Sequence, residues 1–345
     1  MKFHLHHHEK KDGRALWLYS LKERSYIITN DLEPLENTTK PYQKMHPLRG
    51  EPVYFNPSRN TRTLSPPPEY NPLAAVQING YPGEIPVTDF EVAIFQNRWP
   101  GLTDISNEPS TEITAYGRCE VVVYTPNPEG SLADLTVSNI NLLLQAISNR
   151  YKEIMKNEKI SFVLPFENRG SFVGTTLPHP HGQIYAFGDL PPNIECQMEN
   201  AKKKNVFSNL LKDLNPDLIV AESEHTITFC PEFSRYPYET WILPKAHNSS
   251  PESMGEIELN EISNAIKAQV KFFDEVFNTP MPYVLWHAFP AKGFSKHWPY
   301  HIQFWPLQRG EDKMKYLASV EQITGLFLVD VMPVNAAQEI RDFHK

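Results

Sequence analysis

Residues 161–187 read SFVLPFENRGSFVGTTLPHPHGQIYAF and give the strongest structural signal in the sequence. Ser161–Phe166 is a run of apolar and β-branched residues, which predicts a buried strand. Glycines interrupt Glu167–Leu177, which predicts a loop, and a second strand is expected through Gln183–Phe187. The stretch therefore predicts two strands joined by a glycine-bearing loop, with two histidines where that loop ends.

The residues before this stretch predict a helix and further strands. Leu135–Asn157 carries apolar residues at helical spacing and predicts an amphipathic helix. Clusters of β-branched and aromatic residues predict strands at Leu16–Tyr19, Asp89–Phe95 and Arg118–Tyr124. The polar residues His4–His8, in contrast, predict a mobile terminus.

The second half of the chain repeats this order of elements. We expect strands at His225–Cys230 and Glu239–Pro244, a helix at Leu259–Phe277, and strands at Tyr283–Ala288 and Tyr300–Trp305. The first half ends in His-Pro-His-Gly-Gln-Ile-Tyr and the second in Pro-Tyr-His-Ile-Gln-Phe-Trp. The repeat indicates an internal duplication, and it predicts an α+β fold of two tandem halves, each an antiparallel sheet with helices packed on it.

The composition narrows the class of protein. The 345 residues carry a formal net charge of −8 without a basic stripe, which argues against a nucleic-acid partner. No apolar run is long enough to span a membrane, and the first twenty residues lack the apolar core of a secretory signal. The three cysteines, Cys119, Cys196 and Cys230, are widely spaced and are expected to be buried free thiols. We therefore expect a cytoplasmic enzyme.

Two histidines dominate the candidate chemistry. His179 and His181 are two residues apart on an expected strand, so their side chains share a face. A neutral imidazole at His181 could attack phosphorus and form a phosphoramidate, which splits one difficult transfer into two easier steps. The alternative is a structural pair that caps a loop through backbone hydrogen bonds. The neighbouring glycines and neutral donors favour chemistry; they are Asn168, Gly170, Gly174, Thr176, Gly182 and Gln183.

The segment around His181 resembles the active-site motif of galactose-1-phosphate uridylyltransferases, a branch of the histidine triad superfamily. The resemblance extends over most of the chain. It is carried in order by Asp12-Gly13-Arg14, His46-Pro47-Leu48-Arg49-Gly50-Glu51, Phe95-Gln96-Asn97-Arg98-Trp99-Pro100, Tyr236-Pro237-Tyr238-Glu239-Thr240 and Leu243-Pro244-Lys245-Ala246-His247.

This resemblance implies a ping-pong reaction. His181 would attack UDP-glucose, release glucose 1-phosphate, and pass the uridylyl group to galactose 1-phosphate. Hydrolytic relatives carry a third histidine where this chain has Gln183, so Gln183 favours transfer over hydrolysis. The implied organisation is an N-terminal extension at 1–45, two uridylyltransferase halves at 46–189 and 190–345, and a homodimer with shared active sites.

The resemblance also implies which residues bind substrate. His179 would support the nucleophile through its main chain. We expect Lys315 and Glu321 on one helix, where about 600° of rotation would keep them off a shared face. The implied substrate contacts are Arg59, Arg62, Asn97, Asn168, Gly174, Thr176, Lys315 and Glu321.

Many family members hold zinc through a CxxC pair, a later histidine and the first histidine of the motif. This chain has Asn71-Pro72-Leu73-Ala74 in place of the pair, Pro128 in place of the later histidine, and retains only His179. One ligand cannot hold Zn²⁺. We therefore predict no structural zinc and no cofactor.

A second metal site of some relatives uses one glutamate and three histidines. This chain offers His287 and His301, but Gln303 stands where another histidine would be. The glutamate position falls near Glu195–Glu199, with Gln197 as one candidate. We predict that these side chains are hydrogen-bonded structural residues without a metal.

Three other functions stay open at this point. A nucleotide-sugar or dinucleotide phosphorylase shares the His-x-His-x-Gln core, with phosphate as the acceptor. A non-catalytic nucleotide-sugar binding protein would explain the degraded metal positions, although binding alone needs no nucleophile. A hydrolase is disfavoured by Gln183.

Overall fold

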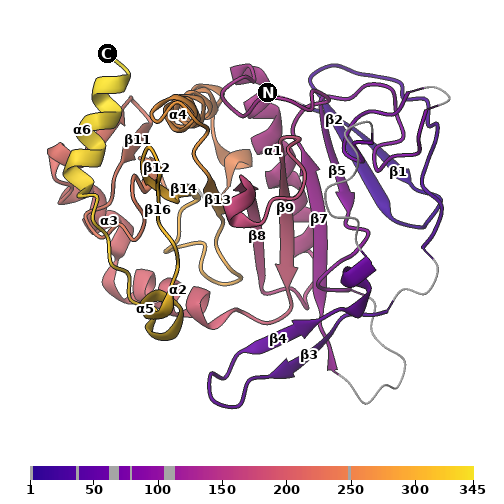
Figure 1. Cartoon of the computed structure of the whole chain (residues 1–345), viewed down its shortest axis with the longest axis horizontal. Helices are drawn as coiled ribbons and strands as arrows, with labels where there is room; N and C mark the ends of the chain where they lie inside the picture. Colours follow the sequence, from indigo (N-terminus) through magenta and orange to yellow (C-terminus); the bar gives the residue numbers. More distant parts are fainter. Residues whose placement is uncertain (1–2, 36–38, 62–69, 78–79, 105–112, 248–249) are drawn as a thin grey trace.

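The computed structural model describes residues 3–345 except 36–38, 62–69, 78–79, 105–112 and 248–249. Its main feature is one large antiparallel sheet that crosses the whole molecule (Figure 1). In spatial order its strands are β1 (His4–Glu9), β2 (Ala15–Ser20), β5 (Val92–Gln96), β7 (Gly117–Val123), β9 (His181–Phe187), β8 (Phe162–Arg169), β13 (Tyr283–Ala288), β14 (His301–Pro306), β12 (Thr240–Pro244), β11 (Thr226–Phe229) and β10 (Ile219–Glu222).

Smaller elements surround this sheet. Strands β4 (Pro52–Phe55), β3 (Tyr42–Met45) and β6 (Ile113–Thr114) form a second sheet, and β15 (Gln308–Gly310) pairs with β16 (Lys313–Met314). The helices of the described residues are α1 (Val137–Met155), α2 (Pro192–Lys204), α3 (Val206–Lys212), α4 (Glu256–Glu275), α5 (Ser319–Thr324) and α6 (Pro333–Phe343), with short 3₁₀ turns η1 (Pro57–Thr61), η2 (Ser171–Val173), η3 (Pro216–Leu218) and η4 (Pro251–Ser253). The predicted α+β class is confirmed.

The two halves of the chain meet at β8 and β13. These strands pair antiparallel, with Tyr283 opposite Arg169 and Leu285 opposite Glu167. On either side of this seam the order β7–β9–β8 of the first half mirrors the order β12–β14–β13 of the second. The predicted duplication is therefore present, and the two halves share a single sheet. Strands β1 and β2, from residues 1–45, continue that sheet beyond β5.

The expectation of a mobile N-terminus is wrong. Residues His4–Glu9 form β1, which pairs with β2 along its whole length, from His4 opposite Ser20 to Glu9 opposite Ala15. The ring of His7 stacks on Trp17 with 5.7 Å between the centroids. The polar composition of β1 suits an edge strand, because hydrogen bonding to an apolar neighbour orders it without burying its own side chains.

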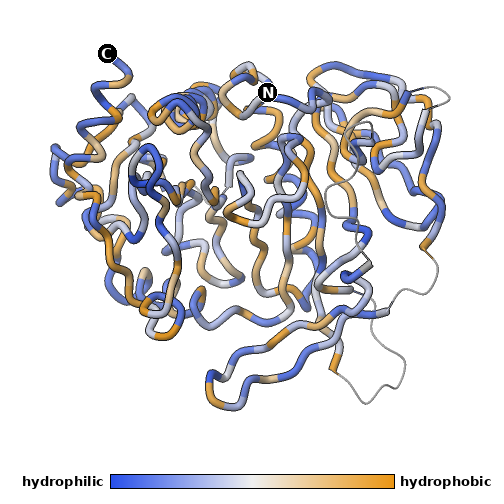
Figure 2. Tube along the Cα trace, in the orientation of Figure 1, coloured by the Kyte–Doolittle hydropathy of each residue, from blue (hydrophilic) through white to orange (hydrophobic). Residues whose placement is uncertain are grey.

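Helices α1 and α4 cover one face of the sheet. They pack against each other, and together with α6 they bury the largest hydrophobic cluster of the protein. Apolar residues at i, i+3 and i+4 explain this, because they place one continuous stripe of each helix against the sheet. Figure 2 shows hydrophobic segments along the central strands and mostly polar residues on the outer surface of the helices. No helix in the described ranges is long and apolar enough to cross a membrane.

Helix α1 begins at a side-chain cap, which gives a first prediction. The Thr136 side chain accepts a hydrogen bond from the amide of Asn139 at 3.1 Å. Thr136→Ala removes this side-chain acceptor and leaves the amide only its contact with the Thr136 carbonyl at 3.0 Å, so it is expected to lower the free energy of unfolding by about 1 kcal/mol. Urea denaturation measures the change, and Thr136→Ser, which keeps the hydroxyl, serves as the matched control. Equal losses in both variants would contradict the cap as the cause.

The opposite face of the sheet is covered differently in the two halves. In the second half, α2 and α3 pack on the sheet through Met198, Ala201 and Phe207, which join Trp286 and Trp298 in a separate cluster. In the first half, loop residues 70–77 and 80–90 cover part of the face and leave cavities. Cys196 of α2 is exposed, so its expected burial is wrong, whereas Cys119 and Cys230 are buried free thiols.

Candidate active site

The loop between β8 and β9 is shaped by glycine and proline. Gly170 and Gly174 both have positive φ, and a Cβ at Gly170 would lie 2.8 Å from the side chain of Pro282. The segment Pro178–Pro180 then runs toward β9, with each residue that precedes a proline restricted to extended backbone. After these glycines and prolines, the regular strand β9 begins at His181, next to the glycine-bearing loop.

Alternation along β9 separates its two faces. Gly182 and Ile184 are buried on the side of α1, whereas His181 and Gln183 are partly exposed on the other side. Within β9, His181 and Gln183 therefore share one face. The expectation that His179 and His181 lie on the same strand is wrong, because β9 begins at His181 and His179 precedes it in the loop. Both side chains line the cavity of the first half of the sheet.

The main chain of His179 orients the ring of His181. The distance between Nδ1 of His181 and the carbonyl oxygen of His179 is 2.7 Å. Because a carbonyl only accepts, Nδ1 carries the proton, and the lone pair of the neutral ring is on Nε2. This arrangement matches the expected support by the His179 main chain, and it suits Nε2 for attack on an electrophile.

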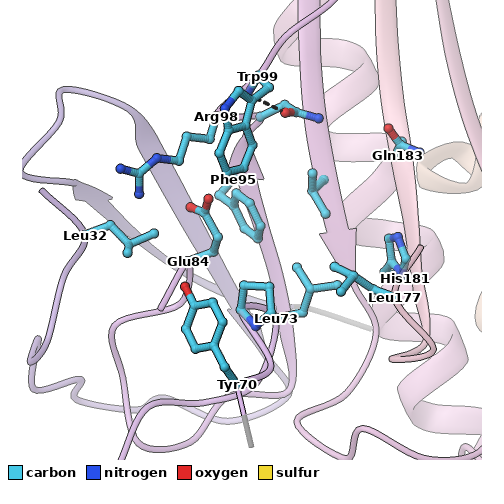
Figure 3. A pocket seen from close by; sticks show the side chains of 13 residues that line it. Leu32, Tyr70, Leu73, Glu84, Phe95, Arg98, Trp99, Leu177, His181 and Gln183 are labelled. Atoms are coloured by element: carbon cyan, nitrogen blue, oxygen red, sulfur yellow. Dashed lines mark hydrogen bonds between the residues drawn. The ribbon is translucent and has the colours of Figure 1, made fainter. Parts of the chain in front are cut away.

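The first cavity is mainly aromatic and apolar. Figure 3 shows His181 and Gln183 on one side and Tyr70, Glu84 and Arg98 across from them. The predicted residue Asn97 lines this cavity and accepts a hydrogen bond from the amide of Trp99 at 2.8 Å. The lining residues are Leu32, Tyr70, Pro72, Leu73, Glu84, Phe95, Asn97, Arg98, Trp99, Val121, Leu177, His181 and Gln183.

A second cavity lies on the other side of His181. It is lined by the glycine-bearing loop, and it includes the predicted residues Asn168, Thr176 and His179. The lining includes hydroxyl and amide side chains, and such groups suit phosphate oxygens; they are Ser131, Asn168, Ser171, Thr175 and Thr176. His181 lines both cavities, so an atom attacked by its Nε2 would lie between an aromatic pocket and a polar one.

A buried acid lies at the base of the second cavity. Glu167 contacts the hydroxyls of Tyr124 and Tyr283 at 3.4 and 3.3 Å. Burial raises the pKa of Glu167 to about 7. The guanidinium of Arg169, which is paired with Asp274, opposes this rise.

Several expected substrate contacts lie outside the residues that line the two cavities. Arg59 donates to the carbonyl of Trp99 at 2.9 Å, at the back of the first cavity wall. Gly174 adjoins the second cavity through Thr175 and Thr176. Arg62 falls outside the described residues.

The expectation that Lys315 and Glu321 are held apart on one helix is wrong. Lys315 precedes α5, so the chain bends between the two residues and their side chains form an ion pair. Lys315 also donates to the carbonyl of Leu328 at 2.8 Å. The hydrogen bond from Lys315 lowers the pKa of Glu321 to about 2. Tyr316 contacts the ring of Phe172, which brings this segment beside the loop of the second cavity.

Sequence reasoning missed a buried charge cluster behind the first cavity. Glu84 accepts from Lys10 at 2.6 Å and from Arg14 at 2.7 Å, and Lys10 is almost fully buried. Burial lowers the pKa of Lys10. Arg14 also donates to the carbonyl of Gln96, next to Asn97. Arg14 belongs to a motif seen in the sequence, whereas Glu84 lies in no recognisable pattern.

The second half contains a structural counterpart of His181. The Nδ1 atom of His301 lies 2.9 Å from the carbonyl of Pro299, two residues earlier, as Nδ1 of His181 lies beside His179. The Nε2 atom of His301 contacts the amide of Gln303 at 2.9 Å, and Trp305 donates to the same amide group. His301 is fully buried, and burial lowers its pKa to about 4.

The residues expected at a second metal position have hydrogen-bond partners within the protein. His287 contacts the hydroxyl of Tyr300 at 2.8 Å, and the amide of Gln303 meets the Nε2 atom of His301. Gln197 bonds within α2, to the carbonyl of Asn193. Within the described ranges, no group of three or more His, Cys, Asp or Glu side chains is arranged to hold a metal ion.

Comparison with known proteins assigns most of the chain to one family. The family described as galactose-1-phosphate uridyl transferase, N-terminal domain, matches residues 92–191. The galactose-1-phosphate uridylyltransferase of Thermotoga maritima is 30% identical over 315 residues, which cover 87% of this chain and 97% of that protein. The enzyme of the same name from Streptomyces lividans is 31% identical over 292 residues, 81% of this chain and 79% of that protein.

A solved structure agrees with these relatives. A uridylyltransferase superposes with a TM-score of 0.75 at 25% identity, and the match covers 88% of this chain and 97% of that one. The matched family segment contains β7, β8, β9 and the loop that carries His179 and His181. By its sequence, its fold and the residues of this site, the chain belongs to the galactose-1-phosphate uridylyltransferase family.

Proposed function

We propose that the protein transfers a uridylyl group from UDP-glucose to galactose 1-phosphate, as the names of its relatives indicate for those enzymes. The observation that carries the proposal is the position of His181. Its ring is oriented by a carbonyl through Nδ1, and it lies at the junction of an aromatic cavity and a polar one. A nucleotide sugar has the same two parts, a planar base and an anionic sugar diphosphate.

The proposed reaction is a double displacement. Nε2 of His181 attacks the α-phosphorus, a nitrogen–phosphorus bond forms, and the bond to the oxygen of glucose 1-phosphate breaks. A phosphate oxygen of galactose 1-phosphate then attacks the same phosphorus, which releases His181 and forms UDP-galactose. The first step exchanges a phosphoanhydride bond for a phosphoramidate bond and the second step does the reverse, so no redox partner is needed.

The two cavities divide the substrate between them. The aromatic side chains of the first cavity, Tyr70, Phe95 and Trp99, suit the uracil ring, and Asn97 contributes polar groups there. The donors of the second cavity, with Asn168 and Thr176, suit the phosphates and the hexose. Gln183 lines the first cavity beside His181, within reach of the phosphoryl oxygens.

Gln183 provides a prediction about hydrolysis. A sugar phosphate is a weakly basic leaving group, so a neutral amide suffices, and it has no proton to pass to water. Gln183→His is expected to increase UMP release from UDP-glucose by about 10-fold or more when no acceptor is present. Chromatography of the nucleotide products measures it. If UMP release stays at the wild-type level while transfer falls, Gln183 does not set the choice between transfer and hydrolysis.

A homodimer in the cytoplasm is part of the same proposal. The C-terminal segment exposes large apolar side chains that a second copy would cover; they are Tyr316, Leu317, Val320, Ile323, Leu326, Leu328, Met332 and Val334. The ribbon of β3 and β4 projects from the body and exposes Met45, Val53 and Phe55 (Figure 1). Light scattering after gel filtration tests this, and a mass of 39.7 kDa in solution would contradict it.

The activity test uses the two proposed substrates and two alternative substrates. With UDP-glucose and galactose 1-phosphate, the proposal expects UDP-galactose and glucose 1-phosphate in equal amounts. Substitution of inorganic phosphate for the sugar phosphate, and of ADP-glucose for UDP-glucose, tests the phosphorylase. Faster turnover with phosphate would identify phosphate, not galactose 1-phosphate, as the acceptor. Binding of UDP-glucose with neither turnover nor labelling of His181 would indicate a non-catalytic binding protein.

A further inference from the structure

The imidazole of His179 has a hydrogen-bond partner at each ring nitrogen. Nε2 lies 2.7 Å from the carbonyl oxygen of Thr125, and Nδ1 lies 2.9 Å from the side-chain nitrogen of Asn71. The side chain is 1% exposed, so neither partner is replaced by solvent. A buried ring with two such partners is held in one orientation.

The orientation of the Asn71 amide follows from the backbone beside it. Its oxygen accepts a hydrogen bond from the amide of Leu73 at 3.0 Å, which leaves its NH₂ group for His179. The Thr125 carbonyl only accepts, so Nε2 of His179 is the donor. In a neutral ring Nδ1 is then an acceptor, which matches the NH₂ donor of Asn71. In this series of hydrogen bonds, every donor therefore faces an acceptor.

These contacts link the first cavity to the nucleophile. Leu73 lines the first cavity, and its amide begins the sequence of hydrogen bonds through Asn71 and His179 to Thr125. The main chain of His179 supplies the carbonyl that holds Nδ1 of His181 at 2.7 Å. The side chain of Asn71 thus fixes the residue whose carbonyl orients the attacking ring.

The residues at this position do not fit zinc. Relatives with a metal place two cysteines, a histidine and the first motif histidine around it. Here Asn71–Ala74 and Pro128 supply no thiolate or imidazole. The one imidazole, His179, has both nitrogens engaged by Asn71 and Thr125, so no lone pair points at a cation. A tetrahedral site needs at least three protein ligands.

We propose that Asn71 is a positioning residue that replaces a metal ion: its amide holds His179 in the neutral Nε2–H form and thereby fixes the carbonyl that orients His181. The effect of Asn71 on turnover rests on the proposed function, whereas its effect on the His179 ring and the absence of a metal requirement do not. Burial also lowers the pKa of His179, which supports the neutral ring.

The variants distinguish loss of the Asn71 NH₂ donor from loss of the turn in which the Leu73 amide donates to the Asn71 oxygen. Asn71→Asp keeps an oxygen for the amide of Leu73 but removes the NH₂ donor to His179. We expect kcat to fall about 10-fold to 100-fold in Asn71→Asp and Asn71→Ala, with the KM for galactose 1-phosphate unchanged. Asn215→Ala is the matched control, because Asn215 accepts from the amide two residues later, as Asn71 does, and it lies outside both cavities. Its kcat is expected to equal that of the wild type.

The ring of His179 provides a readout that is independent of activity. Histidine-selective ¹⁵N NMR of the full-length wild type is expected to show one nitrogen protonated and one not for His179, with the proton on Nε2 and the signal assigned by its loss in His179→Gln. In Asn71→Asp this pattern is expected to change, because the carboxylate can only accept. Treatment with a chelator, followed by dialysis and addition of Zn²⁺, is expected to leave the melting temperature and kcat of the wild type unchanged.

Three outcomes would overturn the proposal. They are an Nδ1–H ring at His179 in the wild type, loss of stability or turnover on metal removal that Zn²⁺ restores, and full kcat in a folded Asn71→Asp. Absence of transferase activity in the wild type, with the expected ring signals, would instead reject the proposed function and leave the assignment of the hydrogen bonds intact.

Discussion

Replacement of His181 with alanine is expected to abolish uridylyl transfer, with kcat reduced by at least about 10⁴-fold. The imidazole is the group that forms the bond to phosphorus in the proposed reaction, and no neighbouring side chain can replace it. His179 is buried, and both of its nitrogens are engaged. The folded structure should survive the change, because His181 is partly exposed at the start of β9.

The measurement combines turnover with covalent labelling. UDP-glucose with a radiolabelled α-phosphate is expected to label the wild type and to leave His181→Ala unlabelled. His247→Ala is the matched control, because His247 also bonds a backbone carbonyl through its ring, that of Ser295 at 2.7 Å, and lies outside both cavities. Label retained on His181→Ala would identify a different nucleophile, and equal losses in both variants would point to a folding defect.

Replacement of Gly182 with alanine is expected to cause the largest loss of stability among the variants considered. A Cβ at this position would lie 2.4 Å from the hydroxyl oxygen of Tyr124 and 2.7 Å from the carbonyl oxygen of Phe166. Neither atom can move easily, because Tyr124 is fully buried and Phe166 belongs to the adjacent strand. We expect a loss of about 3 kcal/mol in the free energy of unfolding, at the upper end of overpacking effects.

The same change should also reduce activity, because Gly182 lies between His181 and Gln183. A shift of β9 by a fraction of an ångström would move both side chains relative to the phosphorus. The double variant Gly182→Ala with Tyr124→Phe removes the closer of the two contacts. It is expected to recover part of the stability, because the carbonyl of Phe166 still stands 2.7 Å away.

Chemical denaturation of the single and double variants gives the coupling between the two sites. Tyr124→Phe alone is the control, since it removes a hydroxyl that contacts Glu167 at 3.4 Å. If Gly182→Ala matches the wild type in stability and kcat, the close packing beneath the active-site strand has no functional role. If the double variant is no more stable than Gly182→Ala, the contact with the Phe166 carbonyl alone accounts for the loss of stability.

The sequence predicted the elements of the duplicated core well. The helix expected at Leu135–Asn157 is α1, which is two residues shorter at each end, and the strands expected at Tyr283–Ala288 and Tyr300–Trp305 are β13 and β14, which agree to within one residue at each end. These elements have strong periodicity and buried apolar residues, so local pattern and tertiary packing agree. His179, His181 and Gln183 could be proposed as site residues from the sequence for a similar reason, because they occupy one short segment.

Features that depend on contacts with residues distant in the sequence were not predicted. Strand β1 is polar and pairs with β2 along its whole length. The ion pair of Lys315 and Glu321 depends on a bend before α5, which no spacing rule contains. Glu84 has no local signal, because its role arises from Lys10 and Arg14, more than sixty residues away in the chain.

The sequence alone shows a His-x-Gln segment in the last strand of each repeated unit, and glycines and neutral hydrogen-bond donors before His181. Which of the two histidines is accessible depends on the packing around each strand. His181 and His301 have the same hydrogen bond from Nδ1 to the carbonyl two residues earlier. Over His301 the helices α2 and α3 bury the ring among tryptophans, whereas over His181 two cavities remain. The physical reason is that packing of segments distant in sequence, not the strand pattern, sets the access of solvent and substrate to each ring.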